Sequence, residues 1–167
     1  MSRKSAAPPT PGGAADKART VVMLIEKLHA VTSSRLAVIG LDAGLQTAAQ
    51  WLSRPGVGLV VVCDGKGGAA GVLTKSDLVR HLAGSTCSAP PVSELMSRSV
   101  ATCSPSDDVH DVWQTMAARS LQNIPVVDGG RKPLGILDIR DAMKALFEQE
   151  QMEERMLVNY VTGIGYQ

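Results

Sequence analysis

The chain has 167 residues, of which 44% are hydrophobic, so it can bury a core of ordinary size but is too short for two large independent domains. Lysine and arginine number 17 against 16 acidic residues, so no overall charge attracts nucleic acid or an anionic membrane. No apolar run approaches the roughly 20 residues that span a bilayer, the N-terminus lacks an apolar signal segment, and the three cysteines lack metal-type spacing, so we expect a cytoplasmic protein without membrane, nucleic-acid or metal partners.

The first 15 residues are rich in Pro, Gly, Ser and Ala and offer little apolar surface to offset the entropy of ordering them. We therefore expect residues 1–15 to form a disordered tail. From Asp16 the pattern becomes helical, with one apolar face made of Val21, Val22, Leu24, Ile25 and Leu28.

An internal repeat follows. Shifting the chain by 64 positions places Gly71 on Gly135 and Asp77 on Asp141, since 141 minus 77 is 64. Upstream, Leu24 falls on Leu95 at an offset of 71, so the first copy carries seven additional residues near positions 29–35. We expect this insertion to be a loop.

Each copy has the same predicted order of elements, β-α-β-β-α. The expected strands are 36–39 and 58–63 in the first copy and 100–103 and 123–127 in the second, each followed by a further strand, and the helices are 45–52 and 109–116. Their apolar positions, expected in the core, are Leu45, Ala48, Ala49 and Leu52, and Val109, Val112, Trp113 and Met116. The Asp-Gly pairs at 64–65 and 128–129 suit the positive φ of tight hairpins, and a last helix is expected to begin near Thr74 or Asp138.

A half of about 60 residues buries too little surface to be stable alone, so we expect the two copies to share a core. The fold class is therefore predicted as mixed α/β (α+β), with two tandem repeats packed about a pseudo-twofold axis.

The motifs of the second copy resemble those of the CBS domains, which occur as tandem pairs called Bateman modules. The resemblance is carried by residues 91–96, 104–105, 123–128 and 135–141 of the second copy and by residues 71–77 of the first. The first copy departs from the pattern at Val61, where the second has Pro125. The resemblance covers about residues 18–148 and implies CBS domains at 16–84 and 85–148, followed by a helical extension at 149–167.

The resemblance also implies a function. Paired CBS domains bind AMP, ADP, ATP, S-adenosylmethionine or related dinucleotides in two clefts, and binding controls another protein. We therefore expect a regulatory module rather than an enzyme, with an adenine nucleotide as ligand, no other cofactor and an unknown target protein. The alternative is a ligand-free dimerisation or interaction module.

The family pattern Gly-apolar-apolar-Thr-x-x-Asp supplies a hydroxyl and a carboxylate for ribose, and it maps onto Thr74 and Asp77 and, in the second copy, onto Asp138 and Asp141. By pseudo-symmetry we expect Asp77 to work with residues 101–104, and Asp141 with residues 37–40. The full set of expected ligand-binding residues is Val38, Ile39, Gly58, Val60, Thr74, Lys75, Asp77, Arg80, Ala101, Thr102, Asn123, Ile124, Pro125, Asp138, Arg140 and Asp141.

Two alternatives stay open for these motifs. Thr74-x-x-Asp77 is also a capping box, which satisfies a helix N-terminus without any ligand. Asp138 stands where the family has Thr or Ser, so it is either an N-cap or a carboxylate that repels phosphate in the second cleft unless Arg140, Arg131 or Lys144 neutralises it. We therefore expect the cleft at Thr74 and Asp77 to bind more strongly.

Cys63 and Cys103 lie in predicted strands and are expected to be core residues. The C-terminal extension continues the last helix to about Gly163 and carries an apolar stripe of Phe147, Met152, Met156, Leu157 and Tyr160. The stripe packs either on its own module or on a second subunit. We expect a homodimer formed through helices 45–52 and 109–116, with the extension lying across the partner.

Overall fold

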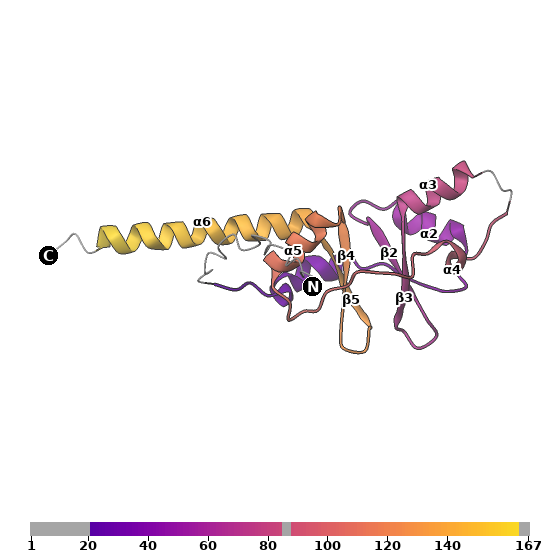
Figure 1. Cartoon of the computed structure of the whole chain (residues 1–167), viewed down its shortest axis with the longest axis horizontal. Coiled ribbons are helices and arrows are strands. Elements are labelled where there is room, and N and C mark those ends of the chain that lie inside the picture. The colour runs from indigo at the N-terminus through magenta and orange to yellow at the C-terminus, as the bar shows by residue number, and fades with distance from the viewer. Residues whose placement is uncertain (1–20, 85–87, 164–167) are drawn as a thin grey trace, which may run out of the picture.

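Two small β-sheets stand side by side at the centre of the molecule (Figure 1). The computed structural model describes residues 21–84 and 88–163. In these ranges the first sheet has the order β1 (Val38–Gly40), β2 (Leu59–Cys63), β3 (Ala69–Thr74), with β1 parallel and β3 antiparallel to β2. The second pairs β4 (Asn123–Val127) with β5 (Pro133–Asp138) in antiparallel register.

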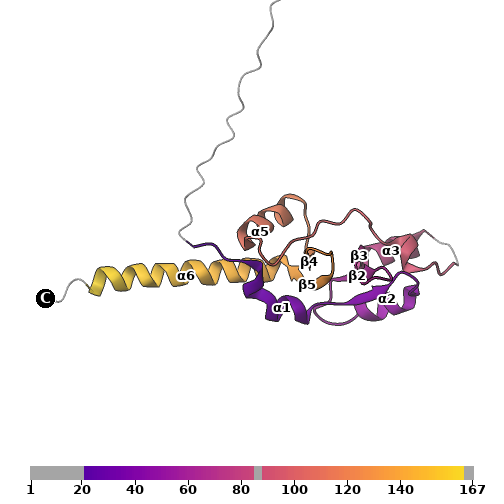
Figure 2. The same cartoon turned by 90° about the horizontal axis from the view of Figure 1, so that it is seen from below.

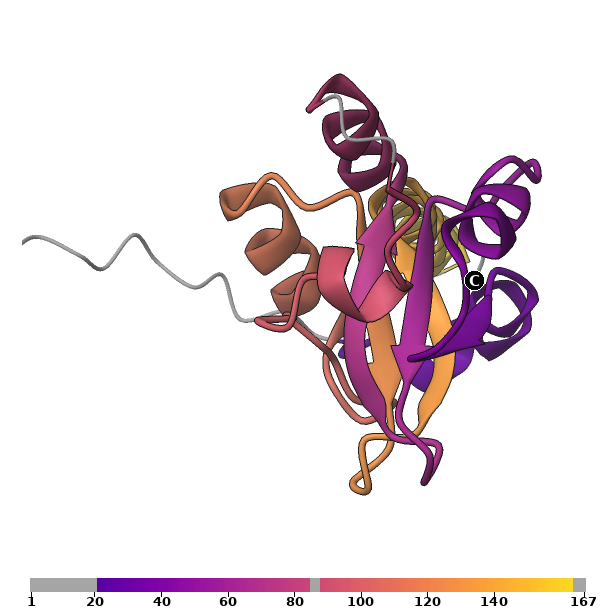
Figure 3. The same cartoon turned by 90° about the vertical axis from the view of Figure 1, so that its right-hand side faces the viewer.

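Helices cover the outside of the sheets. Figure 3 shows the strands between α1 (His29–Ser34) and α2 (Leu45–Leu52) on one side and α5 (Val109–Ala118) on the other. A 3-10 turn, η1 (Ile25–Leu28), precedes α1. The remaining helices are α3 (Lys75–Ala83), α4 (Val92–Leu95) and the long α6 (Ile139–Gly163), which extends well beyond the body (Figure 2). The architecture confirms the predicted mixed α+β fold of two tandem repeats.

The predicted helices are found where periodicity placed them, since α2 begins and ends as expected and α6 ends at Gly163. Ala48, Leu52, Val109, Val112 and Met116 are buried, but Ala49 is exposed, contrary to expectation. The residues of the predicted tail, the beginning of the predicted second domain and the last four residues lie outside the described ranges.

The N-terminal helix prediction is wrong for residues 21–24. Val21 and Val22 are exposed, and the first helical turn begins only at Ile25. The reason is pairing with the second repeat: Val109 N donates to Met23 O at 2.8 Å, and Ile25 N donates to Asp107 O at 2.9 Å. The seven-residue insertion, predicted as a loop, instead contains helix α1.

The predicted strand at 100–103 is also wrong, because only Cys103 forms an isolated bridge, to Val126. Proline explains the difference between the copies. In the first sheet Val61 N donates to Ala37 O at 2.9 Å and holds the chain leading into β1 against β2. Pro125 occupies the equivalent position (125 minus 61 is 64) and has no N–H to donate to Ala101. In the first repeat, β1 (Val38–Gly40) begins two residues and ends one residue later than the predicted strand at 36–39.

In both hairpin loops an aspartate side chain accepts hydrogen bonds from the loop backbone. The positive φ angles do not fall on Gly65 and Gly129, the glycines of the predicted turns. Asp64 Oδ1 accepts hydrogen bonds from Lys66 N and Gly68 N, and Asp128 Oδ1 accepts from Gly130 N and Lys132 N. The left-handed residues are Gly67, with φ of 82°, and Arg131, with φ of 64°. The loops are therefore longer than two-residue turns.

The cores of the two repeats exchange segments. Ile25, which precedes the first repeat, is buried among second-repeat residues such as Val109 and Leu137. Val92 and Met96, which precede the second repeat, are buried in the first-repeat core with Leu52, Leu73 and others. Each core is thus completed by the segment that leads into the other repeat.

The sheets also contact each other directly. A third buried cluster joins Leu59, Val61, Cys63 and Val72 of the first sheet to Ile136 of the second. Ala69 N donates to Arg131 O across the same boundary at 2.9 Å. This third cluster therefore holds the two sheets together between the separate cores of the two repeats.

A substitution at Gly135 can test how α1 packs on the second repeat. A Cβ there would lie 2.7 Å from Thr32 C and 2.8 Å from Thr32 O, both backbone atoms, whereas a Cβ at Gly129 would meet nothing within 4 Å. Gly135→Ala should lower the free energy of unfolding by about 1–3 kcal/mol, measured in urea, because α1 has to shift. The control Gly129→Ala should stay within about 0.5 kcal/mol of the parent. Equal stability of the two variants would contradict this packing.

Candidate functional site

A cavity of about 620 Å³ lies between the two repeats and is lined by both. The first repeat contributes the entry to β2, the end of β3 and the beginning of α3. The second contributes the segment before α5, the entry to β4 and the junction of β5 with α6. The lining residues are Gly56, Val57, Gly58, Leu59, Val72, Thr74, Lys75, Ser76, Asp77, Ser97, Ser99, Val100, Ala101, Ser120, Leu121, Gln122, Asn123, Pro125, Asp138 and Arg140.

Thr74 and Asp77 form one wall and are joined in a capping box at the beginning of α3. Asp77 Oδ2 accepts from Thr74 N and from Thr74 Oγ1, both at 2.8 Å, and Asp77 N donates to Thr74 Oγ1 at 3.4 Å. Asp77 Oδ1 accepts from Arg80 at 3.2 Å. A carboxylate has about four lone-pair sites, so these three bonds leave capacity for another donor. The capping role, left open by the sequence, is present, and it does not use up the carboxylate.

The opposite wall comes from the second repeat. Val100, Ala101 and Pro125 present apolar surface, and Asn123 adds an amide. A Cβ on Gly58 would lie 2.4 Å from Asn123 Nδ2. Glycine at position 58 therefore allows the Asn123 side chain to lie against the first-repeat backbone inside the cavity.

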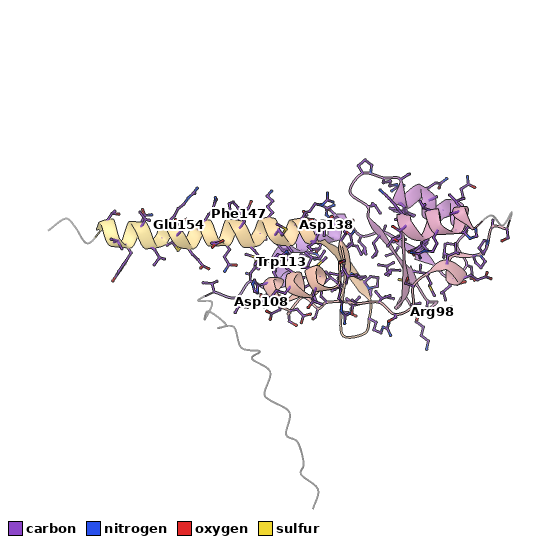
Figure 4. The ribbon with its side chains drawn as sticks, turned by 45° about the horizontal axis from the view of Figure 1, so that its top comes forward. Arg98, Asp108, Trp113, Asp138, Phe147 and Glu154 are labelled. Carbon is purple, nitrogen blue, oxygen red and sulfur yellow. The ribbon has the colours of Figure 1, made fainter. Side chains whose placement is uncertain are left out.

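Asp138 and Arg140 form a tight pair at the base of α6, where Figure 4 labels Asp138. Asp138 Oδ1 accepts from Arg140 N and Nε at 2.8 and 3.0 Å, and Oδ2 accepts from Arg140 NH2 at 2.7 Å. These hydrogen bonds, the side-chain ones above all, lower the pKa of the buried Asp138. The Arg140 side chain is 80% exposed, so its outer edge remains accessible.

Asp138 and Arg140 are a correction to the prediction. The sequence assigns them to the second cleft, but they line the same cavity as Thr74 and Asp77. Of the three cations that the sequence offered for neutralising Asp138, Arg140 is the one that pairs with its carboxylate.

Asp141 pairs with Arg35, and its predicted action together with residues 37–40 stays a prediction. Arg35 Nε donates to Asp141 Oδ2 at 2.6 Å, and Arg35 NH2 donates to Oδ1 at 3.2 Å. Arg35 NH1 donates to Gly56 O at 2.9 Å. Sequence reasoning missed Arg35, although it stands 64 positions before Ser99, which lines the cavity (99 minus 35 is 64).

The structure brings nine of the sixteen predicted residues together around the cavity: Gly58, Thr74, Lys75, Asp77, Ala101, Asn123, Pro125, Asp138 and Arg140. The others lie elsewhere. Ile39 and Val60 are in the first core, Val38 is exposed on β1, and Arg80 reaches Asp77 from outside the lining. Thr102 and Ile124 line a separate cavity of about 260 Å³. The lining also includes four polar residues that no motif indicated: Ser97, Ser99, Ser120 and Gln122.

Among residues 21–84 and 88–163, no group of His, Cys, Asp and Glu side chains has the arrangement of a metal site. No helix in that part of the chain combines the length and hydropathy needed to cross a membrane. Cys63 and Cys103 are buried, and burial raises the pKa of Cys103 to about 12, which keeps it a thiol at neutral pH.

Comparison with known proteins gives consistent results. The profile of the CBS domain family matches residues 26–84 and 92–148. Arabinose 5-phosphate isomerase GutQ of Shigella flexneri is 32% identical over 124 residues, and the chain spans only 39% of that enzyme's length.

Two solved structures have a similar fold. The CBS domain pair of protein MJ0100, in complex with 5'-methylthioadenosine and S-adenosyl-L-methionine, has a TM-score of 0.66 and 22% identity over 78% of this chain and 99% of that one. The structure of CBSX2 in complex with AMP has a TM-score of 0.63 and 21% identity over 76% of this chain and 98% of its own.

Asp138 predicts a pH dependence of stability. Its pKa is lower in the folded chain than its ordinary value near 4, so the pair stabilises the fold above that value, and the contribution is lost as pH falls through the lowered pKa. Asp138→Asn should cost about 1–3 kcal/mol near pH 7 and less at about pH 3, measured by urea unfolding across pH. Asp111→Asn, at a carboxylate that is 75% exposed, is the control and should show little change. A cost for Asp138→Asn that is the same at every pH would contradict the pairing.

Proposed function

The chain belongs to the CBS domain family, and on that premise we propose that the cavity between its repeats binds an adenosine-containing nucleotide and thereby regulates a partner protein. The observation that carries the proposal is the composition of the cavity. A hydroxyl and a carboxylate, Thr74 and Asp77, face apolar walls and an amide from the other repeat, with Lys75 and Arg140 at the same cavity. These are the groups that ribose, adenine and phosphate require.

The cavity offers matching groups for the ribose, adenine and phosphate parts of a nucleotide. The Asp77 carboxylate keeps acceptor capacity for a ribose hydroxyl, and the exposed Arg80 that now bonds Oδ1 is free to move aside. Val100, Ala101 and Pro125 offer apolar surface to the adenine ring. Arg140, oriented by Asp138, and Lys75 offer cations to phosphate. A volume of about 620 Å³ suits a ligand of this size.

The ligands of similar proteins support the class of molecule. MJ0100 holds 5'-methylthioadenosine and S-adenosylmethionine, and CBSX2 holds AMP. Adenosine is the part that these three ligands share. We therefore propose adenosine as the recognised portion, with AMP, ADP, ATP and S-adenosylmethionine as the candidates to test.

We propose regulation rather than catalysis as the consequence of binding. Of the described residues that line the cavity, none is a histidine or a cysteine, and the Asp77 and Asp138 carboxylates are already hydrogen-bonded. The isomerase similarity covers too little of that enzyme to transfer its activity. A ligand in the cavity would contact both repeats, so its binding would act on their relative position, which a partner protein could sense.

We also propose that the protein is a homodimer formed through α6. The helices first expected at the interface, α2 and α5, bury Ala48, Leu52, Val109, Val112 and Met116 within the subunit. Exposed apolar side chains occur instead along α6, which projects from the body (Figures 2 and 4). They are Met143, Phe147, Met152, Met156, Leu157, Val158, Tyr160 and Val161.

The position of this apolar stripe favours a second copy of the chain as the partner that covers it. Ala142 and Ala145 are buried against the subunit itself. Met152, Met156 and Tyr160 continue the same helical face at spacings of three or four residues, past the end of the body. Two such helices pairing about a twofold axis would cover each other's stripe.

Nucleotide binding predicts a specific effect of Asp77→Ala. A nucleotide at about one hundred times its Kd should stabilise the folded chain by about 2.7 kcal/mol, seen as a raised unfolding temperature. Asp77→Ala should weaken affinity roughly tenfold to a hundredfold in calorimetry, since a charged hydrogen-bond acceptor is lost. Asp108→Ala is the matched control, because it removes the N-cap of α5 away from this cavity and should leave affinity unchanged. Full affinity in a folded Asp77→Ala protein would refute the site.

The dimer proposal predicts a mass in light scattering of about twice the 17.6 kDa chain at micromolar concentration. Deleting residues 149–167 should shift the protein toward monomer. The single substitution Met156→Glu should do the same, because it places a charge in the stripe, whereas Gln151→Glu, at an exposed polar position of α6, should not. A monomeric parent protein would contradict the proposal.

A further inference from the structure

The two clefts of the pseudo-symmetric module differ at one pair of positions. Downstream of the insertion, residues 64 apart occupy equivalent places, so Asp77 corresponds to Asp141 (141 minus 77 is 64). Ser99, directly before the second copy of this segment, stands where the first copy has Arg35 at the end of its insertion. Ser99 and Asp77 both line the 620 Å³ cavity, whereas Asp141 is outside its lining and bonds directly to Arg35.

The Arg35 side chain makes three hydrogen bonds, two to Asp141 and one to Gly56, a residue that lines the 620 Å³ cavity. Its guanidinium uses both oxygens of Asp141 in a fork, at 2.6 and 3.2 Å, and its third nitrogen donates to Gly56 O at 2.9 Å. The two side chains are only 21% and 19% exposed, so solvent screens this pair less than a surface ion pair. The carboxylate equivalent to the proposed ribose acceptor is therefore already occupied by a cation of the same chain.

A difference in backbone hydrogen bonding between the repeats also favours ligand binding at Asp77 over binding at Asp141. Ala37 O accepts from Val61 N, whereas the equivalent bond to Ala101 cannot form because Pro125 has no N–H. Ala101 lies in the wall of the open cavity, while Ala37 is held in the first sheet and is buried. The Asp141 carboxylate and the Ala37 carbonyl are thus both hydrogen-bonded to other groups of the same chain.

The insertion in the first repeat explains how Arg35 is held. The seven additional residues contain the six residues of α1, and Arg35 is the C-cap that follows them. Thr32 of α1 packs against Gly135, which fixes the helix on the second repeat, near the beginning of α6 where Asp141 lies. The second repeat has no such insertion before Ser99.

From these contacts we infer that Arg35 takes the place of a ligand in the second cleft, so that each chain binds a single nucleotide, at Asp77. This inference rests on the proposed function. A neutral ribose diol would have to replace a bidentate, charge-assisted pair and leave the guanidinium without its carboxylate. Removing the guanidinium exposes Asp141 as a second acceptor, equivalent to Asp77.

Calorimetric titration of the full chain with AMP, ADP, ATP and S-adenosylmethionine tests the inference. The parent should bind one nucleotide per chain, and Arg35→Ser, which installs the residue of the equivalent position, should bind two. In Arg35→Ser combined with Asp77→Ala, only the second cleft should bind, giving one nucleotide per chain. Arg54→Ser is the control, because Arg54 stacks on Trp51 away from both carboxylates and should leave one site. Arg35→Gln, which removes the charge and keeps a side chain of intermediate length, should also bind two nucleotides and serves if Arg35→Ser fails to fold.

The outcomes separate the two proposals. One site in the parent and still one in a folded Arg35→Ser or Arg35→Gln protein would overturn the role of Arg35 and leave the proposed function intact. Two sites in the parent would overturn it as well. No binding by the parent but one site in Arg35→Ser would support Arg35 as the occupant of its cleft and refute the site at Asp77. No binding by any variant would refute both.

Discussion

The exchange of segments between the repeats is the constraint on which the rest of the structure depends. Ile25 completes the core of the second repeat, and Val92 and Met96 complete the core of the first. Neither repeat can therefore close its core without the chain that leads into the other. The cavity lies on the boundary that this exchange creates, and its walls are held at a distance set by packing in both cores.

Arginine pairing then makes two similar repeats inequivalent. Asp138 and Asp141 stand three residues apart at the beginning of α6, and each has a different arginine. Arg140, in the first turn of α6, bonds Asp138 at the end of β5 and lines the cavity, whereas Arg35, at the C-terminal end of α1, bonds Asp141. Without these partners, two neighbouring carboxylates would repel each other and any bound phosphate. With them, the cavity keeps an accessible cation, Arg140, and Asp141 is engaged by Arg35.

Pro125 adds a second difference between the repeats, in backbone hydrogen bonding. Val61 supplies an N–H that holds the segment before β1, and Pro125 at the equivalent position cannot. The second repeat consequently has only a single bridge at Cys103 where the first has a strand. The segment around Ala101 is left beside the cavity, opposite Thr74 and Asp77. A difference of one residue between the copies thus affects both the sheet and the site.

The sequence alone determined the features that are local. The 64-residue offset predicted the repeat, helical periodicity predicted α2 and α5, and the motif at Thr74 and Asp77 predicted a capped helix beside a candidate cleft. Such features depend on residues within a few positions of one another, which a pattern can record. The helix at 29–34, the bridge in place of a strand at 100–103 and the pairing of Asp141 with Arg35 were not predicted, whereas Arg140 was one of three cations named as possible partners of Asp138. Arg35 and Asp141 are separated by 106 residues, and only the packing of α1 on the second repeat brings them together, because hydrogen bonds between distant segments leave no periodic trace in the sequence.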